Sequence, residues 1–130
     1  MNISVQKVGQ GREASTTLSW RWSGGNVSLE FETIARPVFS EVVEKIYVSE
    51  YLKSSIYIFA KSGELVRTIE IPTIDGYQYR GLNKNKKSKN GIALLYVPVD
   101  EGRGNEWRDI EQYELNDESP NLGSFLDIYR

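Results

Sequence analysis

Two pairs of carboxylates stand two residues apart in segments of alternating polarity, and their spacing is the first feature that could support chemistry. The pairs are Glu30 with Glu32 and Asp109 with Glu111. Because successive strand residues point to opposite faces, the two members of each pair share one face of a strand. Carboxylates that hydrolyse glycosides lie instead across a cleft, roughly 5–10 Å apart, and one has a raised pKa. We therefore interpret both pairs as the solvated face of a sheet.

The sequence of 130 residues contains no Cys and no His. This composition excludes thiol nucleophiles, His-based triads, disulfides and zinc sites built from Cys or His. The acidic loop at residues 100–106 does not match an EF-hand, because its third and fifth positions are Gly102 and Gly104, which have no side-chain oxygen. We expect a protein that is not an enzyme and that binds neither a cofactor nor a metal.

Charge is balanced over the whole chain and uneven within it. The 16 Lys and Arg nearly offset the 18 Asp and Glu, for a net charge of −2, so we expect neither nucleic acid nor a membrane as a partner. Residues 76–99 carry five basic side chains and no acidic one, whereas residues 100–118 carry eight acidic and two basic ones. Complementary charge steers association. Either the lysine loop of residues 84–89 or the acidic segment could therefore meet a partner.

Alternation of apolar and polar residues with a period of two recurs along the chain and predicts an all-β, mainly antiparallel fold. Residues 15–22 and 26–33 alternate on either side of a Ser-Gly-Gly turn, which predicts a hairpin. Its first strand places Trp20 and Trp22 on the core face. At this length we expect a single domain over residues 1–130, built as a small sandwich or barrel-like meander.

Two further local features concern turns and a possible helix. Gly63 suits the left-handed position of a type I turn with a G1 bulge. Residues 36–46 have apolar side chains at helical spacing and Pro37 in a position that could begin a helix. A short helix near residues 37–45 therefore competes with a bent strand.

Residues 45–72, KIYVSEYLKSSIYIFAKSGELVRTIEIP, resemble one blade of an NHL-like β-propeller repeat, in which a KIYV strand is followed by a hairpin of the form IYIF..SGELVRTI. The resemblance implies a three-stranded meander in this segment, and residues 78–115 would form a second copy. A propeller needs at least four blades of roughly 40 residues. The resemblance therefore implies, as the alternative to a sandwich, propeller-like blades that close into a ring by oligomerisation.

The chain is rich in aromatic residues, with three Trp and eight Tyr. Interface hot spots are enriched in Trp, Tyr and Arg, and charge complementarity favours carboxylates opposite a basic partner. We therefore expect partner-binding side chains among the aromatic residues and carboxylates of the second half of the chain. They are Tyr77, Tyr79, Asp100, Glu101, Trp107, Asp109, Glu111 and Glu114.

Size, charge and the missing catalytic residue types together favour a non-catalytic protein-binding module. Small acidic bacterial immunity proteins, which neutralise a cognate toxin, have this profile, so the expected partner is a protein such as a basic toxin domain. The alternative is a carbohydrate bound by a lectin assembled from propeller-like blades, because sugars stack on the same aromatic residue types. The lack of Cys and of an N-terminal apolar run favours the cytoplasm.

Overall fold

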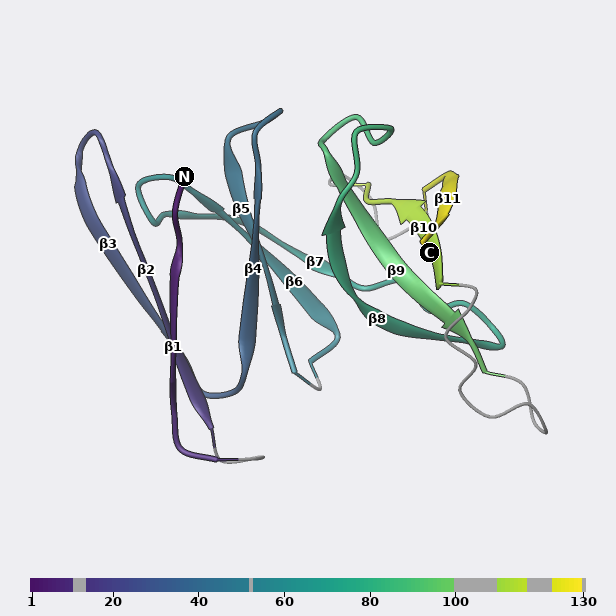
Figure 1. Ribbon diagram of the computed structural model, residues 1–130, viewed down its shortest axis with the longest axis horizontal. Coiled ribbons are helices and arrows are strands. Elements are labelled where there is room, and N and C mark those ends of the chain that lie inside the picture. The colour runs from purple at the N-terminus through teal and green to yellow at the C-terminus, as the bar shows by residue number, and fades with distance from the viewer. Residues whose placement is uncertain (11–13, 52, 100–109, 117–122, 130) are drawn as a thin grey trace. The chain divides into compact units, whose positions relative to one another are not determined.

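The computed structural model describes residues 1–10, 14–51, 53–99, 110–116 and 123–129, and these residues form an all-β structure (Figure 1). No helix occurs among them, and hence none that could cross a membrane. The chain divides into two compact units, unit 1 from Met1 to Glu70 and unit 2 from Ile71 to Arg130. The predicted all-β class is confirmed, and the single domain over residues 1–130 stays a prediction.

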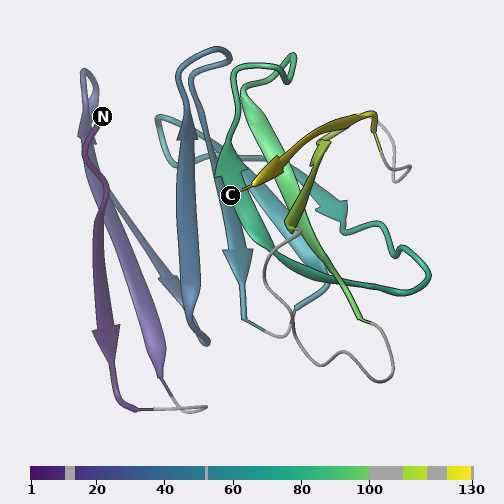
Figure 2. The same ribbon diagram turned by 45° about the vertical axis from the view of Figure 1, so that its right-hand side comes forward.

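Unit 1 contains two antiparallel sheets made of consecutive strands (Figure 2). The first sheet has the order β1-β2-β3 and the second the order β4-β5-β6-β7, and neither closes into a barrel within the described residues. The strands are β1 (Ser4–Val8), β2 (Ser15–Trp22), β3 (Gly25–Phe31), β4 (Ala35–Ser40), β5 (Lys45–Glu50), β6 (Ser55–Ala60) and β7 (Leu65–Glu70).

The two sheets of unit 1 enclose a common apolar core. Trp20 is only 4% exposed, and its indole Nε1 donates a hydrogen bond of 2.7 Å to the carbonyl oxygen of Lys61, in the turn between β6 and β7. The predicted core position of Trp20 is confirmed, and Trp22 packs against the same core while partly buried. This arrangement is sandwich-like. The buried core residues are Leu18, Trp20, Val27, Ala35, Ile46, Val48 and Phe59.

A network of polar side chains, which we call the Glu50 network, also joins the two sheets. Thr16 Oγ1 donates to the carbonyl oxygen of Thr33 and accepts the backbone N–H of Ala35, both at 2.9 Å. Thr33 Oγ1 donates to Glu50 Oε2 at 2.5 Å. Burial, together with a hydrogen bond to the Glu50 carboxylate, raises the pKa of Tyr57. The buried Glu50 carboxylate at the end of β5 therefore has hydroxyl donors from two other segments of unit 1.

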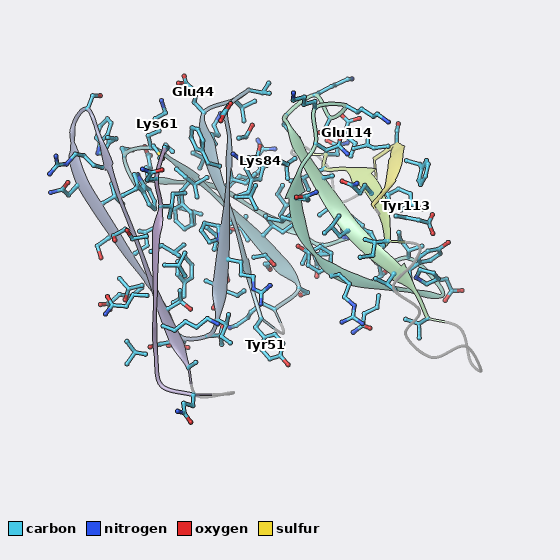
Figure 3. All side chains as sticks on the ribbon, in the orientation of Figure 1. Glu44, Tyr51, Lys61, Lys84, Tyr113 and Glu114 are labelled. Carbon is cyan, nitrogen blue, oxygen red and sulfur yellow. The ribbon has the colours of Figure 1, made fainter. Side chains whose placement is uncertain are left out.

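The helix considered near residues 37–45 is wrong. Residues 35–40 form β4, which pairs residue by residue with β5, so that Pro37 lies opposite Val48. The hydrogen bonds that β4 forms with β5 stabilise the strand, and the helical spacing of the apolar residues does not offset them. Pro37 lacks an N–H, which is tolerated because β4 is an edge strand. A turn follows at residues 41–44. Its last residue, Glu44, has a positive φ of 53° and forms an exposed ion pair of 2.7 Å with Lys61 (Figure 3).

Unit 2 contains one antiparallel sheet with the order β11-β10-β9-β8. Its inner strand β9, from Ile92 to Pro98, is buried on both faces over most of its length. Strands β5, β6 and β7 of unit 1 match the meander predicted for residues 45–72, whose resemblance to a propeller blade stays a prediction. The strands of unit 2 are β8 (Tyr77–Lys84), β9 (Ile92–Pro98), β10 (Ile110–Glu114) and β11 (Phe125–Tyr129).

Gly63 is in the turn between β6 and β7 and has a φ of +89°, which confirms the predicted left-handed glycine. A Cβ there would lie 2.6 Å from Cγ1 of the core residue Val27. We expect Gly63→Ala to lower the free energy of unfolding by about 2 kcal/mol or more, because backbone strain and overpacking add. Gly76→Ala is the matched control, since its φ is +79° and no atom lies within 4 Å of the added Cβ.

Urea unfolding of the two variants measures the difference. Gly76→Ala carries only the backbone strain, about 1 kcal/mol. Equal losses for both variants would show that the contact with Val27 does not constrain the turn.

Candidate functional site

A row of aromatic rings crosses the sheet of unit 2, one ring from each strand. Tyr79, Tyr96, Tyr113 and Phe125 follow each other at centroid distances of 5.8, 5.7 and 5.6 Å, with interplanar angles of 67°, 86° and 74°. Edge-to-face contacts of this kind are favourable and hold each ring in one orientation. Tyr96 is 1% exposed and Phe125 is 52% exposed. The row therefore leads from the buried middle of the sheet to an open aromatic ring on the edge strand β11.

Strand register places these rings on one face. Tyr96 of β9 pairs with Tyr79 of β8 and with Glu111 of β10, and Tyr113 of β10 pairs with Phe125 of β11. Directly paired residues share a face of the sheet, as do residues two apart on one strand. Glu111 therefore lies on the same face as the aromatic row.

Glu111 is the acceptor for two tyrosine hydroxyls on this face. Tyr113 Oη donates to Glu111 Oε1 at 2.9 Å, and the hydroxyl of Tyr77 also forms a hydrogen bond with this carboxylate. All three side chains are half-buried. We call Tyr77, Glu111 and Tyr113 the Glu111 cluster; Figure 3 labels Tyr113 within it. Two phenols from β8 and β10 thus fix the carboxylate in one place.

The hydroxyls of this face are held in their protonated form. Burial, then the hydrogen bond to Glu111 and its negative charge, raises the pKa of Tyr113 to about 12. The pKa of Tyr77 is raised first by its hydrogen bond to Glu111 and then by burial. Burial also raises the pKa of Tyr96, whose hydroxyl donates to the carbonyl oxygen of Pro72. All three phenols therefore act as donors at neutral pH.

The lysine loop between β8 and β9 is an ordered hairpin attached to β10. Asn90 is buried; its Nδ2 donates to the carbonyl oxygen of Leu115 at 2.9 Å, and its Oδ1 accepts the backbone N–H of Ile92 at 3.1 Å. Glu114 Oε1 accepts the backbone N–H of Lys89 at 3.0 Å. Glu114, labelled in Figure 3, is therefore a cap of this hairpin. It lies on the face of β10 opposite to Glu111, since the two residues are three apart.

The structure brings together only part of the predicted partner-binding set. Tyr77, Tyr79 and Glu111 meet on one face of the sheet, whereas Glu114 lies on the other. The interpretation of Glu111 as a solvated carboxylate is wrong, because it is half-buried among phenols. The four remaining predicted residues, Asp100, Glu101, Trp107 and Asp109, lie outside the described residues.

The carboxylate pair in the first half of the chain has the predicted environment. Glu30 and Glu32 are both exposed, as expected for the solvated side of a sheet. Within the described part of the chain, no group of three or more carboxylates gathers in a way that could hold a metal ion.

Sequence reasoning did not select Tyr96, Tyr113 or Phe125. Tyr113 stands two residues after Glu111 and so shares its face on any strand, which is a signal that was available. The contacts with Tyr96 and Phe125 depend on cross-strand register, and the sequence does not contain that information in any local pattern.

Comparison of the chain with protein-family models, with curated proteins and with solved structures finds no match.

The phenols of the Glu111 cluster give a prediction for alkaline pH. A tyrosine whose pKa is higher in the folded than in the unfolded protein contributes to stability. This contribution is complete below the pKa of the unfolded state and is lost as the pH rises through the pKa of the folded state. For Tyr113 the window runs from about 10 to about 12. We expect phenolate absorbance to show a late-titrating fraction in this window, and Glu111→Gln to move part of it to lower pH because the carboxylate charge is gone. Titration of the protein in denaturant, where all tyrosines are solvated, is the control; identical curves would contradict the prediction.

The hairpin contacts give a prediction for stability and for amide exchange. Asn90→Ala leaves the buried Leu115 carbonyl without its partner and should cost about 1–3 kcal/mol of unfolding free energy. Glu114→Ala removes one contact at the surface, should cost no more than about 1 kcal/mol, and should speed hydrogen exchange at the Lys89 amide. Exchange measured by NMR and urea unfolding check both variants. An unchanged exchange rate at Lys89 would show that Glu114 does not cap the hairpin in solution.

Proposed function

We propose that the protein is a non-catalytic protein-binding module that neutralises a basic partner, such as a toxin domain, through the aromatic face of unit 2. The observation that carries this proposal is the row of rings from Tyr79 to Phe125, with the Glu111 carboxylate held beside it. Tyr and Trp dominate the energetically important positions of protein interfaces. A half-buried carboxylate among such rings favours a cationic partner.

The rigidity of this face supports a role in binding. Each ring of the row contacts the next edge to face, and two phenols fix the Glu111 side chain. Side chains that are already ordered lose little conformational entropy when a partner binds. The face therefore offers contact area and one directed negative charge with a small ordering cost.

The proposal includes a cytoplasmic location for the protein. A protein that neutralises a toxin made in the same cell must meet it before the toxin acts, and a chain with no Cys is compatible with a reducing compartment. Neighbouring reading frames then become the first place to look for the partner.

The proposal predicts that a neighbouring frame encodes a toxin. Each flanking reading frame is expressed alone and together with this chain. We expect one frame to arrest growth and co-expression to restore it, and the purified pair to form a complex. If no flanking frame is toxic, or if this chain does not relieve the arrest, the proposed function is wrong.

The same pair of proteins tests the binding face. Phe125→Ala should speed dissociation and weaken binding by about 2 kcal/mol or more, as expected for an aromatic anchor. Tyr51→Ala is the matched control, because Tyr51 is 53% exposed and Phe125 is 52% exposed, and Tyr51 lies in unit 1. Surface plasmon resonance gives both rates. If the complex forms and Tyr51→Ala weakens it as much as Phe125→Ala does, the contact surface is not this face.

A glycan array distinguishes the lectin alternative from the protein-binding function. Sugars bind to exposed aromatic rings next to hydrogen-bonding carboxylates, so this face would also suit a carbohydrate. Glycan binding that is lost in Phe125→Ala, in the absence of a toxic neighbour, would replace the protein-binding function with the lectin function.

A further inference from the structure

The Glu111 carboxylate has acceptor capacity that its tyrosine partners do not use. An ionised carboxylate offers about four lone-pair positions on its two oxygens. Tyr113 Oη and the hydroxyl of Tyr77 donate to it, so two donors are accounted for. Two further positions have no donor among the residues that the structure describes, and two is the number that a guanidinium group fills when it binds a carboxylate through two parallel N–H groups.

The charge of Glu111 is not balanced by an ion pair within the described residues. An ion pair does join Glu44 to Lys61, in unit 1. Both phenols that contact Glu111 are neutral, since their pKa values are raised. A half-buried carboxylate with neutral partners attracts a cation more strongly than an exposed one does, because water screens it less.

The rings around the carboxylate fit a flat cation. Tyr113 contacts Tyr96 on one side and Phe125 on the other, at centroid distances of 5.7 and 5.6 Å, so its orientation is fixed. A guanidinium is planar and weakly hydrated and stacks on aromatic rings while it forms hydrogen bonds in its own plane. A lysine ammonium is a compact and strongly hydrated point charge, and it lacks this match.

From this geometry we propose that the Glu111 cluster is a receptor for an arginine side chain presented by a protein partner. The inference rests on the proposed function and deepens it, because it names the side chain by which the partner is recognised. The arginine would form a bidentate pair with Glu111 and lie beside the ring of Tyr113, whose hydroxyl keeps the carboxylate in place.

The test uses the whole chain and small probes in place of the partner. Acetyl-arginine amide, acetyl-lysine amide and acetyl-citrulline amide are titrated into isotope-labelled protein and followed by NMR. With the arginine probe we expect saturable chemical-shift changes at Tyr77, Glu111 and Tyr113. The lysine probe should bind about tenfold more weakly, and the citrulline probe, which has the same shape without the charge, should not bind. Equal binding of arginine and lysine, or binding of citrulline, would overturn the proposal.

Variants locate the binding to this carboxylate. Glu111→Gln keeps an acceptor for the phenols and removes the charge, so the fold is retained and affinity for the arginine probe should fall about tenfold or more. Tyr113→Phe removes the hydroxyl that positions Glu111 and should weaken binding about threefold. Glu30→Gln removes an exposed carboxylate of unit 1 and is the matched control, with no expected change. Equal affinity in Glu111→Gln and in Glu30→Gln would exclude an arginine site at Glu111.

This result can be told apart from the outcome for the proposed function. If the arginine probe binds at Glu111 and no flanking frame is toxic, the receptor stands and the toxin-neutralising role fails. If a toxin is neutralised equally well by the Glu111→Gln variant, the role stands and the arginine receptor is wrong.

Discussion

The register of β9 with its two neighbours is the constraint on which the candidate site depends. A shift of one residue in either pairing would move Tyr79 or Glu111 to the opposite face and separate it from Tyr96. The hairpin between β8 and β9 specifies this register, because Asn90 bonds both its own turn and the end of β10. Glu114 adds a second attachment from β10 to the same loop. Asn90 of the turn and Glu114 of β10 thus hold the strands in the register at which the aromatic residues meet.

Both units place a carboxylate among neutral hydroxyls, and the two arrangements differ in exposure. In unit 1 the Glu50 carboxylate is 8% exposed and has Thr33 and Tyr57 as partners. In unit 2 Glu111 is half-buried. A buried carboxylate needs such donors because its hydration is lost. Glu50 is enclosed within the sandwich and connects its sheets, whereas Glu111 keeps partial access to solvent.

Local patterns predicted the fold better than the site. Period-two alternation located most strands, and Gly63 was placed correctly because a positive φ is a local requirement. The helical spacing of residues 36–46 made a helix an alternative to a strand, and this helix does not form. The spacing is a local feature, whereas the pairing of β4 with β5, which determines the structure, is not. Glu111 and Tyr79 were selected as single residues. Their meeting through Tyr113 and the remaining rings depends on contacts between strands distant in sequence, which no window of the sequence contains.

The aromatic row also reaches the beginning of unit 2. Tyr96, the buried ring inside the row, donates a hydrogen bond to the carbonyl oxygen of Pro72, in the segment that precedes β8. The rings between Phe125 and Tyr96 are in contact throughout, so a side chain that restrains Tyr113 also restrains the ring that anchors Pro72. A ligand bound to the aromatic face would therefore slow the local unfolding of residues 71–76. Binding would then be detectable in the first turn of unit 2, away from the bound ligand.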